Sequence, residues 1–63
     1  MNGEQLINMD VYMLLSIVNM KLRDEFSDLN TLCEDIDINK QKLLDKLETA
    51  GYTYNSSINQ FIL

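Results

Sequence analysis

The 63-residue sequence contains no histidine and no proline, and it has only one cysteine and two glycines. Because Cys33 is the only cysteine, the chain cannot form an internal disulfide, and the lack of histidine excludes a Cys/His metal cluster. Two glycines are too few for a glycine-rich loop that cradles phosphate. Without proline, which breaks helices, the composition favours helical structure.

The sequence offers no arrangement of residues that would support catalysis. Cys33 has no histidine to activate it, and its position on an apolar helix face predicts a buried, structural thiol. The acidic run at residues 34–39 matches the first ligand positions of a calcium loop, but Lys40 and Lys46 stand where such a loop needs glycine and glutamate. We interpret the run as helix capping on either side of a turn. We expect no catalytic residue, no metal site and no cofactor.

Acidic residues outnumber basic residues ten to five, which gives a net charge of −5. Such a chain repels nucleic acids and anionic membranes at long range, so neither is favoured as a partner. Residues 11–20 form the longest apolar-rich stretch, but Ser16 and Asn19 interrupt it, and it is too short to span a bilayer. Residues 1–5 carry no positive charge and do not resemble a secretory signal. We expect a cytoplasmic protein that does not associate with membranes.

The longest predicted helix begins at about Asp10, a suitable N-cap, and ends at about Phe26. Its main apolar stripe follows helical spacing and is the predicted core face. The stripe consists of Val11, Leu14, Leu15, Val18, Leu22 and Phe26.

Two shorter helices are predicted to follow. One covers about residues 29–35 and has Asp28 as its N-cap. The other covers about residues 40–50, and the turn at 37–39 supplies its cap. Gly51 then stands where a helix C′ glycine belongs.

After the third helix the sequence changes to β-favouring residues. Residues 52–63 favour strands at both ends and a turn in the middle, which predicts a short hairpin. Tyr52 and Tyr54 would share one face, where Phe61 and Leu63 can meet them. We predict a single domain of the mainly α class, a helix-turn-helix-like three-helix bundle with a C-terminal β-hairpin. Three helices followed by a hairpin is the order of elements in winged-helix domains.

A second apolar set lies beside the core stripe of the first helix and consists of Met13, Ile17 and Met20. A helix that is apolar around most of its circumference needs cover on more than one side, and a chain this short supplies little of it. These residues are therefore the predicted oligomer interface. Our first functional hypothesis is an interaction module that forms a homodimer and binds another protein.

The third helix supports an alternative hypothesis, a winged-helix-like DNA-binding protein or transcriptional regulator. Residues 38–50 contain three lysines and two acidic residues, so this segment is locally basic within an acidic chain. A helix-turn-helix protein would place its recognition residues there. The other interpretation is a solvated helix face, which we favour because three lysines make few phosphate contacts and no arginine is available for guanine. The candidate recognition residues are Asn39, Lys40, Gln41, Lys42 and Lys46.

A polar strip on the first helix contains Ser16, Asn19 and Arg23 at helical spacing. Such side chains can bond to the C-terminal tail or to a second subunit. We predict a structural cluster in which Asn19 and Arg23 make specific hydrogen bonds, with Asp24 or with carbonyl groups near the hairpin.

Two motifs stand out, S-I-V-N-M-K-L-R-D at residues 16–24 and G-Y-x-Y-x-x-x-x-N-x-F at residues 51–61. With them the chain resembles a small bacterial family of about 60 residues that is known only as a domain of unknown function. Asn55 stands where the family pattern has aspartate, and either residue suits the start of a turn. The resemblance implies a bacterial, cytoplasmic protein and brings no established activity, ligand or catalytic residue.

Overall fold

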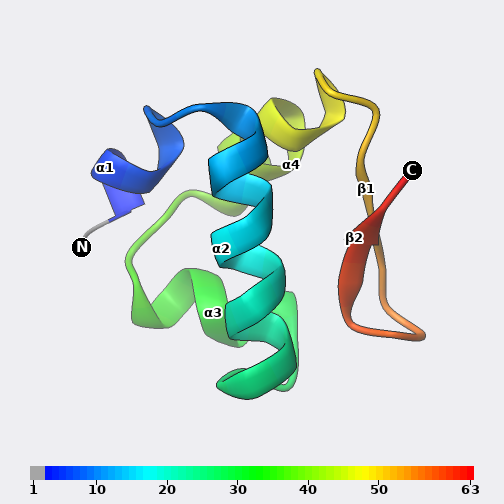
Figure 1. Ribbon diagram of the computed structural model, residues 1–63. Coiled ribbons are helices and arrows are strands. Elements are labelled where there is room, and N and C mark those ends of the chain that lie inside the picture. Colours follow the sequence, from blue (N-terminus) through cyan, green and yellow to red (C-terminus); the bar gives the residue numbers. More distant parts are fainter. Residues whose placement is uncertain (1–2) are drawn as a thin grey trace.

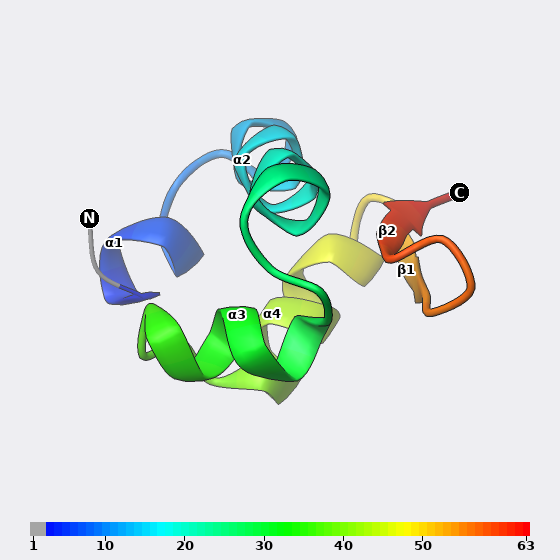
Figure 2. The same ribbon diagram turned by 90° about the horizontal axis from the view of Figure 1, so that it is seen from below.

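The computed structural model describes residues 3–63, which form four helices followed by a two-stranded antiparallel hairpin (Figure 1). Helix α2 stands in the middle of the domain, with α1 to one side of it and the hairpin to the other. Seen along α2, helices α3 and α4 lie on the same side of it (Figure 2). This confirms the predicted mainly α domain with a C-terminal hairpin. The elements in chain order are α1 (Gly3–Ile7), α2 (Val11–Asp24), α3 (Leu29–Asp35), α4 (Lys40–Glu48), β1 (Thr53–Asn55) and β2 (Gln60–Ile62).

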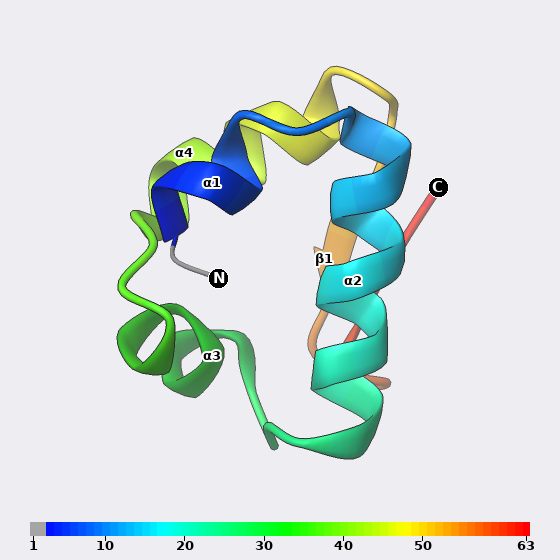
Figure 3. The same cartoon turned by 60° about the vertical axis from the view of Figure 1, so that its left-hand side comes forward.

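Residues 3–63 contain one helix more than the three predicted. The additional helix is α1. A helix of five residues is unstable in isolation, so packing must hold it in place. Leu6 is fully buried in the core, and α1 lies against α4 (Figure 3). A side chain on Gly3 would come within 2.7 Å of the Ile38 Cα atom, so only glycine lets α1 approach this turn so closely.

The predicted N-caps are present. The Asp10 carboxylate accepts hydrogen bonds from the N–H groups of the second and third residues of α2, and Asp28 accepts one from Thr31 N–H at 2.7 Å. That bond holds the pKa of Asp28 below its ordinary value. Within the turn at 37–39, Asn39 caps α4 and accepts a hydrogen bond from Lys42 N–H. Each cap satisfies backbone donors that have no partner within the helix.

The C-terminal ends of α3 and α4 use the same kind of turn. Gly51 has a φ of 85°, and the N–H of Tyr52 donates to Leu47 O, which is the pattern of a Schellman motif. After α3, Asp37 adopts the left-handed conformation with a φ of 54°, and Ile38 N–H reaches back to the last turn of α3. The acidic run at 34–39 is thus used to end one helix and begin the next. Helices α2 and α4 each end about two residues earlier than predicted, at Asp24 and Glu48.

A single apolar core joins all four helices to the hairpin. Cys33 belongs to it, which confirms the predicted buried thiol, and burial raises the pKa of that thiol. None of the helices within residues 3–63 combines the length and the apolar character needed to cross a membrane. The buried core residues are Leu6, Leu14, Val18, Leu22, Leu29, Leu32, Cys33, Ile38, Leu43, Leu47 and Phe61.

The hairpin pairs β1 with β2 and places Tyr54 directly opposite Phe61. Their ring centroids are 5.4 Å apart, as expected for a tilted aromatic pair. Phe61 is buried, and Tyr52 and Tyr54 pack partly against the core. Leu63 does not share this arrangement, since it is 83% exposed. It follows the last residue of β2, where the packing against the helices ends.

Candidate interaction site

The side of α2 that points away from the core exposes large apolar side chains. Tyr12, Met13 and Met20 are 58%, 59% and 45% exposed, and the exposed Ser16 lies between the two methionines along the helix. We call these four residues the outer face of α2. Ile17, the third member of the predicted interface, is only partly exposed and packs against the core. The set Met13, Ile17 and Met20 is therefore divided between the surface and the interior.

The outer face lies in a segment without charge. No acidic or basic residue occurs from Val11 to Met20, although the chain carries 15 charged residues in 63. Exposed helix surfaces normally carry charged and polar residues. An uncharged, partly apolar face on an acidic domain is therefore a candidate site for contact with another protein.

The side of α2 that faces the hairpin makes polar contacts. Asn19 Nδ2 donates to Phe61 O at 3.1 Å, and Phe61 N–H donates to Asn19 Oδ1 at 2.8 Å. Gln60 Nε2 donates to the main-chain oxygen of Asn19 at 3.0 Å. Because Phe61 presents its main-chain groups to Asn19, they point away from β1, and the Asn19 amide occupies the place of a neighbouring strand.

The structure contains the hydrogen bonds expected of Asn19 and Arg23 but separates the predicted polar strip. Arg23 bonds to Asp24 through two nitrogen atoms, each 3.0 Å from a carboxylate oxygen, and both side chains are exposed. Ser16 is exposed on the outer face. Of the three residues, Asn19 is the one whose side chain bonds to the hairpin, so they do not form one cluster.

Asn59, which the sequence analysis did not single out for a role, fastens the other end of β2 to α2. Its amide donates to Leu22 O in the last turn of α2, at 2.9 Å, and to Phe26 O just after the helix, at 3.0 Å. Its Oδ1 atom accepts a hydrogen bond from the Tyr54 hydroxyl. Asn59 also has a φ of 53°, a conformation that asparagine tolerates better than most residues. The sequence signal that could have identified Asn59 is its place in the second motif, two residues before Phe61.

The candidate recognition residues lie at the start of α4, except Lys46, which lies in its last turn. Asn39 is occupied as the helix cap, and Gln41 Nε2 donates to Asp45 at 2.9 Å. Lys40 and Lys42 are exposed, whereas Lys46 is partly buried.

The side of α4 opposite its buried leucines is not basic. Gln41 and Asp45 lie there, since their positions along the helix place them away from Leu43 and Leu47. Lys42 and Glu48 flank them on either side, so the charges of this surface are mixed. A phosphate backbone approaching α4 directly would meet the Asp45 carboxylate, which weakens the case for a nucleic-acid site.

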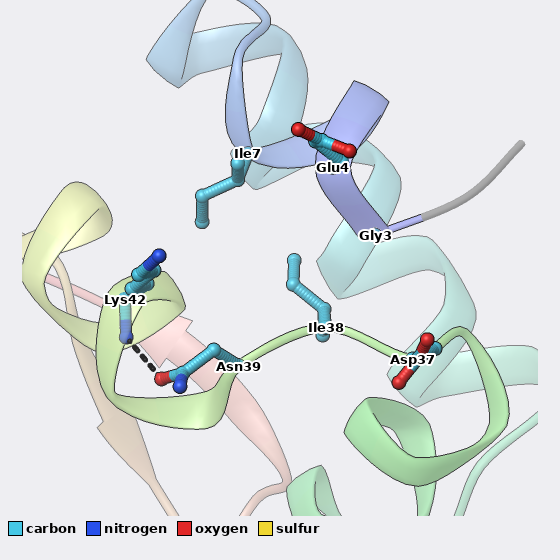
Figure 4. Close-up of a pocket in the computed structure, with 7 residues that line it drawn as sticks. All are labelled: Gly3, Glu4, Ile7, Asp37, Ile38, Asn39 and Lys42. Atoms are coloured by element: carbon cyan, nitrogen blue, oxygen red, sulfur yellow. Dashed lines mark hydrogen bonds between the residues drawn. The ribbon is translucent and has the colours of Figure 1, made fainter.

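A pocket of about 230 Å³ lies between α1 and the turn that joins α3 to α4 (Figure 4). Ile7 and Ile38 point toward each other across it, from α1 and from the turn. Its charged lining residues, Glu4, Asp37 and Lys42, are all exposed to solvent. Since water already solvates these groups, the pocket has no built polar site, and the outer face of α2 is the stronger candidate.

The comparisons with known proteins leave the activity open and identify the family. No curated protein matches the chain, and no solved structure matches it. A family model covers residues 8–61 and therefore includes both motifs, the outer face of α2 and every residue that fastens the hairpin. Its range begins just after α1. The chain belongs to the family described as Domain of unknown function (DUF4250).

Proposed function

We propose that this domain is a protein interaction module that self-associates through the outer face of α2 and binds other proteins with the same surface. The observation that carries the proposal is the exposure of Tyr12, Met13 and Met20 in a segment without charge. Removal of apolar surface from water is the main driving force of protein association. Methionine also adapts its shape to different partners, which suits a surface that binds more than one protein. The proposed role is binding without a chemical step.

Sedimentation velocity over a series of protein concentrations tests the proposal. The native chain should shift from monomer to dimer as concentration rises. The double variant Met13→Glu, Met20→Glu should stay monomeric, because two added charges on each copy would have to be buried without partners. Glutamate is a good helix former, so α2 should remain intact in this variant.

Ile58→Glu is the matched control. Ile58 is 56% exposed but lies in the hairpin turn, away from the outer face of α2. This variant gains charge and loses exposed apolar surface, yet it should dimerise as the native chain does. A native chain that stays monomeric at its highest soluble concentration would overturn the proposal.

Binding of duplex DNA by α4 is the less supported function. The order of elements and the lysines at 40 and 42 favour it, whereas the exposed carboxylates of Asp45 and Glu48 on the same helix oppose it. We expect no binding to mixed-sequence duplex DNA in a fluorescence anisotropy titration at low salt, where electrostatic binding is strongest. Binding that weakens as salt is added would instead favour the regulator hypothesis.

A further inference from the structure

We propose that α1 covers a second protein-binding surface and gives way there to a helix of a partner protein. The surface is the one that α1 occupies in the structure, and we call it the α1 seat. It consists of Ile38 in the turn before α4 and the side of α4 against which α1 lies (Figure 3). The proposal does not depend on self-association through the outer face of α2, which belongs to a different helix.

One side chain anchors α1 in the core. Leu6 is 1% exposed, whereas Ile7 is half-buried beside it. A helix of five residues is too short to be stable by itself, and segments with few buried apolar contacts open locally while the rest stays folded. The family model begins at residue 8, so the pattern that defines the domain does not include α1. We therefore expect α1 to leave its seat more readily than any other helix unfolds.

The contact between α1 and its seat is incompletely filled. The pocket of about 230 Å³ lies there, with Ile7 and Ile38 on opposite sides of it (Figure 4). Protein interiors are normally close-packed, and a cavity of about 150 Å³ is large enough to hold a benzene ring. A helix with a larger apolar side chain in place of Ile7 would therefore bury more apolar surface at the seat than α1 does.

The charges at the seat also favour another occupant. Glu4 of α1 and Asp37 of the turn line the same pocket, where Lys42 is the one base among the lining residues. The chain as a whole has a net charge of −5. A partner helix with a basic residue in place of Glu4 would be attracted by Asp37 and by the net charge of the domain.

The pattern of α1 shows what such a helix must carry. A Cβ atom on Gly3 would lie 2.7 Å from the Ile38 Cα atom, so glycine is needed at this place. Leu6 and Ile7 follow three and four residues later, on the same side of the helix. The inferred partner is an amphipathic helix with glycine, a basic residue directly after it, and leucine and a large apolar residue three and four positions after the glycine. Such helices commonly bind by laying apolar anchors against a hydrophobic surface.

A peptide titration followed by NMR tests the proposal. The probe is an acetylated and amidated peptide of residues 3–9, and the receiving protein is the full chain with Leu6→Glu, which removes the anchor of its own α1. The peptide should shift the amide signals of Ile38 and Asn39 with a dissociation constant on the order of millimolar, since so short a helix is marginal in water. The native chain should bind it more weakly by about tenfold or more, because its own α1 occupies the seat.

A modified peptide tests the inferred chemistry of the partner. The peptide with Glu4→Lys and Ile7→Phe should bind the same receiving protein about tenfold more tightly than the native peptide. Its matched control carries Leu6→Glu in addition and should not bind. Tight binding of that control would show unspecific attraction to the acidic domain and overturn the proposal.

Gly3→Ala provides a second receiving protein, because its Cβ atom displaces α1 and leaves the seat unchanged. Glu4→Ala, on the exposed side of α1, is the matched control and should behave as the native chain. Unfolding of both Leu6→Glu and Gly3→Ala would show that the fold requires α1 and overturn the proposal. Folded variants that do not bind the peptide, or that bind it as the native chain does, would also overturn it.

The other possible occupant is α1 of a second copy. A dimer of Gly3→Ala that forms at lower concentration than that of Glu4→Ala would assign the seat to an exchanged α1 and overturn the partner helix. Each of these results concerns the seat alone. The proposed function fails separately, when the native chain stays monomeric in sedimentation.

Discussion

The two sides of α2 reverse the usual distribution of polar and apolar residues. The side that faces the hairpin makes its contact with the amide of Asn19, whereas the side that faces solvent carries Met13 and Met20. Polar side chains normally face water, and apolar side chains normally face the interior. The hairpin is therefore held on α2 by a directional contact, and the methionines on the other side take no part in it.

A directional contact matters here because the hairpin is short. A two-stranded hairpin is marginally stable by itself, and β1 and β2 have three residues each. Apolar packing of Phe61 alone would resist sliding along α2 only weakly. The Asn19 amide engages both main-chain groups of Phe61 and also covers the free edge of β2, which would otherwise be open to another chain.

Asn19→Ala should have the largest effect on the stability of the domain. This change removes two hydrogen bonds and leaves the partly buried N–H and C=O of Phe61 without partners, which should lower the free energy of unfolding by about 2–3 kcal/mol. Urea unfolding followed by circular dichroism measures it. Ser16→Ala, on the outer face of the same helix, should change stability by less than about 0.5 kcal/mol. Equal costs for the two variants would contradict the assigned role of Asn19.

A smaller loss is expected from Asn59→Gly. Glycine keeps the positive φ of this position but removes the amide that bonds to Leu22 O and Phe26 O, so the cost should be about 1–2 kcal/mol. Hydrogen exchange should show faster opening of the hairpin and of the last turn of α2. Ser56→Ala, which alters an exposed residue of the same turn, is the control and should leave exchange rates unchanged.

The double variant Met13→Ser, Met20→Ser removes apolar surface from the outer face of α2. In dilute solution it should cost less than about 1 kcal/mol, because both side chains are largely exposed and serine lowers helix propensity only slightly. Thermal unfolding at low protein concentration measures this. A loss as large as that of Leu14→Ala, a fully buried neighbour on α2, would mean that the methionines support the fold.

The smallest effect should come from Arg23→Ala. The hydrogen bond from Arg23 lowers the pKa of Asp24 below its ordinary value of 3.8, so the pair stabilises the fold above that pH. The contribution is lost as pH falls through the lower folded pKa of Asp24. Since the pair is exposed, the variant should differ only slightly from the native chain at neutral pH and not at all in strong acid. A difference that grows toward acid would contradict this assignment.

Local features of the fold were predictable because they depend on neighbouring residues. Asp10 and Asp28 cap helices through main-chain groups two or three residues away, and Gly51 ends α4 within one turn. Helix α1 was missed because its five residues have no local signal, and its stability comes from Leu6 in the core and from the close contact at Gly3.

The candidate site was predictable only in part. Helical spacing identified Met13 and Met20 as a set apart from the core stripe, but it could not show that Ile17 packs against the core. The spacing of Ser16, Asn19 and Arg23 was correct as a strip, yet each residue has a different environment. Exposure depends on elements distant in sequence, which periodicity does not describe.

The sequence by itself determined the helical class, the caps, the hairpin and the uncharged segment of α2, because composition and short-range spacing govern these features. Only the tertiary structure decided what the motifs do. It brought Asn19 to Phe61, 42 residues away, and Asn59 to Leu22, 37 residues away. Hydrogen bonds of this range depend on how the hairpin docks onto α2, and that docking also leaves Met13 and Met20 exposed.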